Sequence, residues 1–176
     1  NDGSGRFKDV TENSGVLSAG NRIHRSAIYA DYDNDGMVDM FVTVNGQQVE
    51  DGSGNNIFDK YQGKGILFHN ETKNNNRWIK VRLEGVKSNK DGFGSQVVIH
   101  TANDVFSQSL VSGQGYFSSH AKELYFGLGS ENKIDKIEIK WPSGINQSFN
   151  NIPSNQTIYV LENGELYQNT LVLKNR

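Results

Sequence analysis

The 176-residue sequence contains no cysteine, and this absence excludes several kinds of chemistry. Without thiols the chain can form neither a disulfide framework nor a thiolate metal site, and it has no cysteine nucleophile. Proline is also scarce, with 2 residues against 19 glycines. Most turns must therefore use Gly, Asn and Asp, residues that accept positive φ angles or hydrogen-bond their own backbone.

The sequence also lacks a dominant charge and a long apolar run. The formal net charge is −2, which gives no electrostatic reason to expect nucleic acid or an anionic membrane surface as a partner. No apolar segment approaches the roughly 20 residues that a membrane-crossing helix needs, so we expect no membrane insertion. Hydrophobic residues make up 35% of the chain. This low share predicts a thin or sheet-like core.

Alternation of apolar and polar residues with a period of two is the main pattern that is present. In the segment 78–83, Ile79, Val81 and Leu83 share one face, and Lys80 and Arg82 share the other. This period, with β-branched and aromatic residues, predicts strands, and no segment shows sustained helical spacing with caps. The other predicted strands are 26–30, 37–44 (ended by Gly46), 65–69, 96–101, 106–111, 124–127, 135–141, 157–161 and, in the tail, 171–173.

The polar, Asn-rich segment 70–77 is the best candidate for a domain boundary. It predicts a first domain at 1–72 and a second domain with a C-terminal tail at 73–176. The second is large enough for a small β-sandwich, whereas the first is too small to bury much apolar surface alone. We therefore expect an all-β chain that is a piece of a longer protein.

The densest chemical signal is the acidic loop Asp-Tyr-Asp-Asn-Asp-Gly-Met-Val-Asp at 31–39. Ca²⁺ prefers six to eight oxygen ligands, and alternate residues of a tight loop can point their side chains inward. Gly36 would permit the sharp reversal that such a loop needs. The expected calcium ligands are the carboxylates of Asp31, Asp33, Asp35 and Asp39 and the backbone carbonyl of Met37.

Two other interpretations of this loop are weaker. An EF-hand needs Glu at position twelve and flanking helices, but Val42 occupies that position and both flanks are predicted strands. A plain polar turn needs only one or two Asp or Asn residues. Four carboxylates within nine residues repel one another strongly unless a cation neutralises them. A calcium site between two strands is the better description.

Residues 30–45, which contain this loop, resemble the FG-GAP or VCBS repeat. The segment 1–12 is similar to the start of such a repeat, and 65–70 is similar to the strand that follows its calcium loop. The resemblance implies one blade unit of an integrin-type β-propeller with calcium bound in the loop. A complete propeller needs several blades, so the first domain would be a fragment of one.

The second half resembles the ASPIC/UnbV domain of cartilage-acidic-protein-like chains, over about 77–162. Several segments agree in order with that family: 78–85, 88–99, 112–119, 124–129 and 137–144. The resemblance implies an all-β accessory domain, β-sandwich-like in fold, and it supplies no catalytic residues. Together the two resemblances imply a partial propeller blade followed by a sandwich.

Candidate catalytic groups are weak. None of the four histidines has the His-x-His or His-x-x-x-His spacing of a zinc site. A triad of Ser119, His120 and Asp104 is conceivable, but no Gly-x-Ser-x-Gly turn accompanies it. The Gly-Gln-Gly-Tyr run at 113–116 has no helix to bind a phosphate, so it is read as a turn. We therefore expect no enzymatic activity.

The sequence thus predicts a non-catalytic, calcium-binding recognition or adhesion module, extracellular or in the cell envelope, with a protein or glycan as its partner. One alternative is a carbohydrate-binding accessory domain of a polysaccharide-degrading system. Tyr116, Phe117 and Trp141 would line its groove, although Trp141, at the end of a predicted strand and before Pro142, fits a core residue better. The other alternative is a fragment of a larger enzyme, which would need paired carboxylates outside the calcium loop.

Overall fold

The computed structural model describes residues 4–19, 22–59 and 64–168, and it is almost entirely β-structure, which confirms the all-β prediction. Two short 3₁₀ helices, Thr11–Asn13 and Val16–Ala19, precede the strands. Neither of these helices approaches the length and apolarity needed to cross a bilayer. The strands are β1 Arg22–Ala30, β2 Asp39–Glu50, β3 Asn56–Asp59, β4 Ile66–Phe68, β5 Arg77–Glu84, β6 Gln96–His100, β7 Val105–Ser109, β8 Glu123–Gly129, β9 Lys133–Lys140, β10 Asn146–Pro153, β11 Gln156–Leu161 and β12 Glu165–Gln168.

The first sheet contains β1 to β4 in the order β1-β2-β3, with β4 also paired to β2, and all pairs are antiparallel. Among the described residues, Val42 is the one buried hydrophobic side chain that this sheet contributes. Phe41 and Leu67 face each other across β2 and β4 and remain exposed. This sheet therefore has little core of its own, as its small size predicts.

The second unit contains β5 to β12 in two four-stranded sheets, ordered β10-β9-β6-β7 and β12-β11-β5-β8. The two sheets pack face to face, because buried residues of both form one apolar cluster. Ile79 and Val160 come from one sheet, and Val97 and Ile137 come from the other. The segment 69–76 separates the two units, so the predicted boundary at residue 72 lies between β4 and β5.

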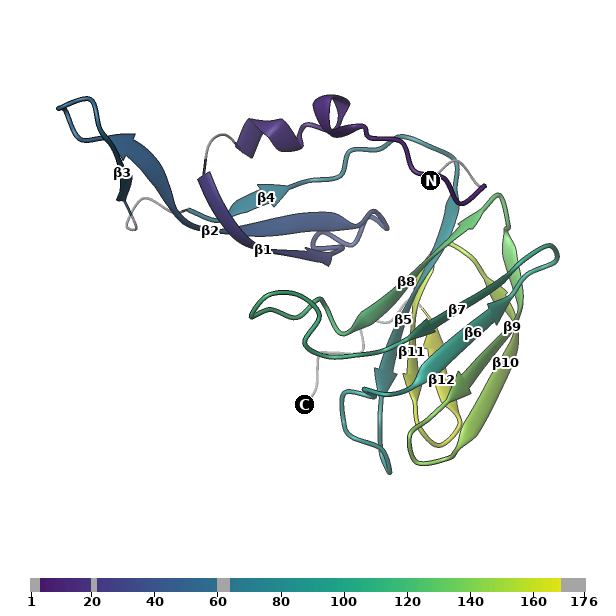
Figure 1. Ribbon diagram of the computed structural model, residues 1–176. Coiled ribbons are helices and arrows are strands. Elements are labelled where there is room, and N and C mark those ends of the chain that lie inside the picture. Colours follow the sequence, from purple (N-terminus) through teal and green to yellow (C-terminus); the bar gives the residue numbers. More distant parts are fainter. Residues whose placement is uncertain (1–3, 20–21, 60–63, 169–176) are drawn as a thin grey trace.

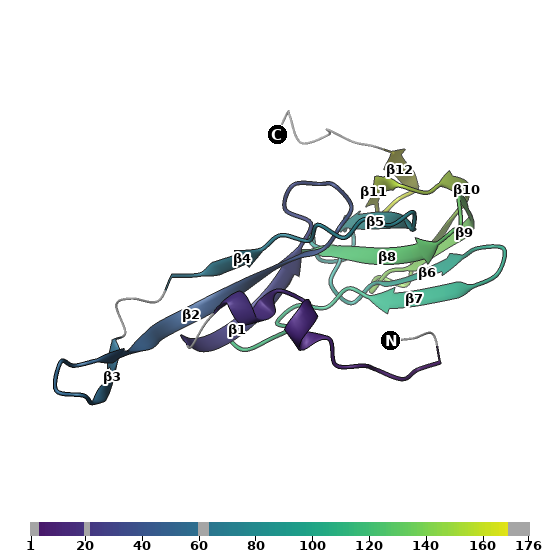
Figure 2. The same cartoon turned by 90° about the horizontal axis from the view of Figure 1, so that it is seen from above.

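The first sheet lies beside β5 and β8 of the second unit, with β3 at the far end (Figures 1 and 2). The loop 110–122, which connects β7 to β8, runs along the edge of β1. Ser26 and Ser118 share a hydrogen bond between their hydroxyl oxygens of 2.5 Å, and the amide of Ala121 donates to the carbonyl of Tyr29. The otherwise unpaired edge of β1 is therefore partly covered by the second unit.

Three strands and one strand end were not predicted. Period-two alternation does not indicate β3, β10 or β12, and Gly46 was expected to end the second strand. Gly46 instead takes a φ of 98° where the pairing of β1 with β2 shifts register, and β2 continues to Glu50. A positive φ at glycine can thus mark a β-bulge within a strand as well as its end. The predicted tail strand at 171–173 lies outside the described residues.

Candidate metal site at the junction of the two units

The acidic loop connects β1 to β2 at a point where the two strands are already paired, Ala30 with Asp39. Asn34 and Gly36 take positive φ angles of 64° and 91°, which curl the chain between them. Asn tolerates this conformation and Gly adopts it without steric cost. The Asp-Asn-Asp-Gly order therefore produces a compact loop whose carboxylates lie close together.

Oxygen atoms of Asp31, Asp33 and Asp39 lie within 4.8 Å of one another. Asp31 and Asp39 are buried, whereas Asp33 is at the surface. Three carboxylates at this separation repel one another unless a cation lies between them. These three residues form the inner part of the predicted ligand set.

Asp31 supplies the observation that most directly indicates a cation. Its side chain is fully excluded from solvent, and its Oδ2 accepts hydrogen bonds from the amide of Gly36 and from Lys80 Nζ. Its Oδ1 is also buried but has no hydrogen-bond partner among the described residues. Buried carboxylate oxygens are rarely left without a partner, because desolvation without compensation is costly. A hard cation beside Asp33 and Asp39 would satisfy this oxygen.

Asp39 is held from two directions. Its Oδ2 accepts from the amide of Tyr32 at 3.1 Å, and its Oδ1 accepts from the amide of Asn70 at 2.8 Å. The side-chain amide of Asn70 in turn donates to the carbonyl of Val38. The segment that follows β4 therefore fixes the last carboxylate of the loop, and each Asp39 oxygen keeps a lone pair for a cation.

Asp35 belongs to a second, exposed group with Asp33 and His69, whose ligand atoms also lie within 4.8 Å of one another. His69 Nε2 is 3.1 Å from Asp33 Oδ2. Asp35 and Met37 line an open hollow of about 330 Å³ together with His69. The five predicted ligands are thus close in space, but Asp35 and Met37 lie on the outer side and Asp31 and Asp39 on the inner side.

Sequence reasoning missed two residues at this site, His69 and Lys80. The pairing of β4 with β2 places Phe68 opposite Met40, so the next residue, His69, lies beside the acidic loop. The similarity of 65–70 to the strand that follows the calcium loop of the repeat is the sequence signal that could have identified it. Lys80 comes from β5 of the second unit, and no local pattern in the sequence links it to the loop.

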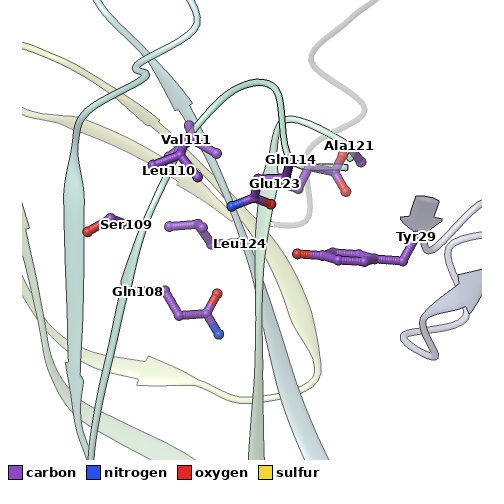
Figure 3. A pocket seen from close by; sticks show the side chains of 9 residues that line it. All are labelled: Tyr29, Gln108, Ser109, Leu110, Val111, Gln114, Ala121, Glu123 and Leu124. Atoms are coloured by element: carbon purple, nitrogen blue, oxygen red, sulfur yellow. The ribbon is translucent and has the colours of Figure 1, made fainter. Parts of the chain in front are cut away.

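A pocket of about 210 Å³ lies at the same junction, between Tyr29 of β1 and the second unit (Figure 3). The ring of Tyr29 extends from β1 toward β8, and Glu123 and Gln114 supply polar groups. Glu123 is buried and forms an ion pair with Arg82. The other lining residues are Gln108, Ser109, Leu110, Val111, Ala121 and Leu124.

The predicted aromatic platform does not form as expected. Trp141 is only 4% exposed and belongs to the core of the second unit, because Ile137 and Ile139 alternate onto the same inward face. Tyr116 and Phe117 are exposed and in edge-to-face contact, with ring centroids 4.7 Å apart. Trp141 must be removed from the candidate ligand site, and the other two residues remain.

The conceivable Ser119–His120–Asp104 triad is not assembled in the described structure. The His120 ring stacks on Tyr29 at 3.8 Å, and its Nδ1 accepts a hydrogen bond from the Tyr29 amide. The Ser119 hydroxyl donates to the carbonyl of His120 and not to its ring. Asp104 is held in a turn with Thr101. His120 therefore serves as a contact between the two units.

Most of the second unit matches a known protein family. Residues 85–166 match the family described as ASPIC and UnbV. The match contains all of β6 to β11, and it supports the resemblance that the sequence indicated for this half of the chain. No curated protein matches the chain significantly. The strand β5, Arg77–Glu84, lies just before the matched residues but shares their core, so we use the label ASPIC/UnbV unit below for all of β5–β12.

A buried carboxylate holds the loops of the ASPIC/UnbV unit together. Glu162 accepts hydrogen bonds from the amides of Val86, Lys87 and Ser88 at 2.6–2.7 Å. It also accepts from the hydroxyls of Ser88 and Ser143. Burial acts to raise the pKa of Glu162, but these hydrogen bonds outweigh it and lower the pKa to about 2. Glu162 is therefore a structural anion that joins the 85–88 loop to the turn after β9.

Proposed function

We propose that the chain is a calcium-binding, non-catalytic recognition or scaffolding module that works outside the cytoplasm. The observation that carries the proposal is the buried, unpartnered Oδ1 of Asp31 beside the carboxylates of Asp33 and Asp39. The donor atoms are oxygens, which suit Ca²⁺ better than a transition metal. The resemblance of 30–45 to an FG-GAP or VCBS repeat also implies that calcium binds in this loop.

Asp31, Asp33 and Asp39 would hold the ion on the inner side, and Asp35 and the Met37 carbonyl would complete the shell on the open side. When bound, calcium supplies positive charge that neutralises the clustered carboxylates. Its role is structural, because the first sheet has little apolar core beneath the loop. A site of the weak extracellular class, with a Kd of ~10⁻⁴–10⁻³ M, would stay filled where calcium is millimolar.

Terbium luminescence tests this proposal, because Tb³⁺ is a luminescent substitute for Ca²⁺ and Trp78 packs directly against Gly36 in the loop. Excitation of tryptophan should sensitise bound terbium, and added calcium should displace it. Trp78→Phe should remove the sensitised signal while Trp141 remains in the core. Sensitised emission that calcium cannot displace, or none at all from the folded protein, would contradict the proposal.

Glycan binding is a second candidate function, favoured by the loop 112–121. Phe117 is 94% exposed and takes a φ of 48°, an unusual conformation for an aromatic residue. Strained, exposed residues are enriched at binding sites. Tyr116 contacts it, and Gln114 of the same loop lines the junction pocket (Figure 3). Screening the parent and Phe117→Ala against a glycan array tests this function, with Phe7→Ala as the control for an exposed ring elsewhere.

A further inference from the structure

We propose that Lys80 of the ASPIC/UnbV unit is a positioning residue for the metal loop, and that it lowers the calcium affinity and couples calcium binding to the docking of the two units. This inference rests on the proposed calcium function. The expected calcium ligands all lie in the loop between β1 and β2 or at the start of β2, whereas Lys80 lies on β5, in a different part of the chain.

The Lys80 side chain is 1% exposed, and its ammonium group enters the acidic loop. Lys80 Nζ donates to Asp31 Oδ2 at 2.8 Å and to Asn34 Oδ1 at 2.9 Å. Glu123 Oε2 lies 3.9 Å away. Lys80 thus binds the loop through one charged residue, Asp31, and one neutral residue, Asn34. It is part of the site although its strand, β5, belongs to the ASPIC/UnbV unit.

Neighbours of Lys80 form a docking surface on the outer face of β5 and β8. Trp78, two residues before Lys80 and on the same face, packs so closely on Gly36 that a Cβ there would lie 2.1 Å from the indole. The Tyr125 hydroxyl accepts from the amide of Asp31 at 3.2 Å and donates to Glu123 at 2.6 Å. The loop is therefore seated on the ASPIC/UnbV unit by packing, by hydrogen bonds and by charge.

The positive charge of Lys80 has two opposite effects on the site. Without calcium, it neutralises a buried carboxylate that would otherwise have no counter-charge. With calcium, it repels the divalent ion that shares the same carboxylate, and ligand charge is what tunes calcium affinity in such loops. Lys80 therefore keeps the loop folded when it is empty, and it weakens binding when the ion arrives.

Lys80→Met separates these effects, because methionine is unbranched and apolar and removes only the charge and its hydrogen bonds. By calorimetry on the full chain, the calcium Kd of Lys80→Met should fall by about tenfold relative to the parent, since the repulsion is gone. Its calcium-free form should melt at a lower temperature than the calcium-free parent. Lys80→Arg retains the charge and should keep a Kd close to that of the parent.

Lys136→Met is the matched control, because Lys136 forms a surface pair with Glu138 on a different sheet. It should leave the calcium Kd unchanged. If the parent binds calcium and Lys80→Met binds it with the same or weaker affinity, the inference fails while the calcium function stands. If the parent binds no calcium, the function itself fails.

A second measurement on the parent protein applies even if Lys80→Met does not fold. The side chain of Tyr125 hydrogen-bonds to the Asp31 amide but is not an expected ligand. Its ring resonances in an NMR spectrum should shift on calcium addition, with a midpoint equal to the calcium Kd. Those of Tyr159, which contacts Tyr167 away from the junction, should not shift. If the ring resonances of Tyr125 do not shift at saturating calcium, calcium binding is not coupled to the docking of the two units.

Discussion

Lys80 Nζ lies 2.8 Å from Asp31 Oδ2, and both side chains are withdrawn from water. This ion pair connects β5 of the ASPIC/UnbV unit to the acidic loop between β1 and β2. A buried ion pair gives little net stability relative to an apolar pair, because both charges must be desolvated. Removal of one partner, however, strongly destabilises the folded state, because the other charge is left buried without a counter-charge.

Removal of the Asp31 carboxylate should therefore destabilise the protein more than removal of any exposed carboxylate in the loop. Asp31→Ala leaves the buried Lys80 ammonium group hydrogen-bonded to Asn34, with the Glu123 carboxylate 3.9 Å away. We expect a loss of about 3–5 kcal/mol in the free energy of unfolding, measured by urea denaturation in chelator. Asp35→Ala, at the surface, should cost less than about 1 kcal/mol. Equal effects of the two substitutions would show that the buried pair is unimportant.

Gly36→Ala should loosen the junction without unfolding the ASPIC/UnbV unit. A Cβ at Gly36 would overlap the Trp78 indole, and the φ of 91° is strained for any residue with a side chain. The fluorescence of Trp78 should shift toward that of an exposed indole. Gly113→Ala is the control, since Gly113 also has a positive φ but nothing within 4 Å of an added Cβ. An identical spectrum for Gly36→Ala and the parent would contradict the observed packing.

Glu162 should make the ASPIC/UnbV unit sensitive to acid. Its pKa is about 2 in the folded state, below the ordinary value of 4.5 that it has when unfolded. A lowered folded pKa stabilises the protein above pH 4.5, and this contribution is lost progressively as the pH falls from 4.5 toward 2. Glu162→Gln should cost about 1–3 kcal/mol at pH 7, because the buried amides and hydroxyls lose a charged acceptor.

The check is a series of urea denaturation curves between pH 7 and pH 2 for the parent and for Glu162→Gln. The difference in unfolding free energy between them should shrink as the pH falls through this window. Exposed carboxylates affect both proteins equally, so they cancel in the difference. A difference that stays constant with pH would mean that Glu162 is not the group that titrates.

Local sequence patterns predicted the core of the ASPIC/UnbV unit well. The alternation of Ile79, Val81 and Leu83 places all three in the apolar cluster. The same alternation through Ile137 and Ile139 extends to Trp141, and Trp141 is buried in the same cluster, as its core role in the sequence interpretation requires. Period two identifies the inward face of a strand because successive side chains point to opposite sides of the sheet.

The same patterns failed wherever a distant segment changed the surroundings of a residue. Alternation assigns Lys80 to a polar face, but the acidic loop covers that face and buries the lysine. β10 was missed because Asn146–Pro153 contains few β-branched residues, and its pairing with β9 establishes the strand. The loop sequence indicated a cluster of carboxylates, and the fold shows that Lys80 and His69 lie beside them.

The most direct test of the account is calorimetric titration of calcium into the chelator-treated full chain. We predict a single site with a Kd of ~10⁻⁴–10⁻³ M, and much weaker binding of magnesium, which requires tight octahedral geometry. Asp33→Ala should abolish the calcium signal while the fold is retained. If the folded parent shows no calcium binding up to about 10 mM, well above the weakest affinity expected for such a loop, the acidic loop is not a calcium site.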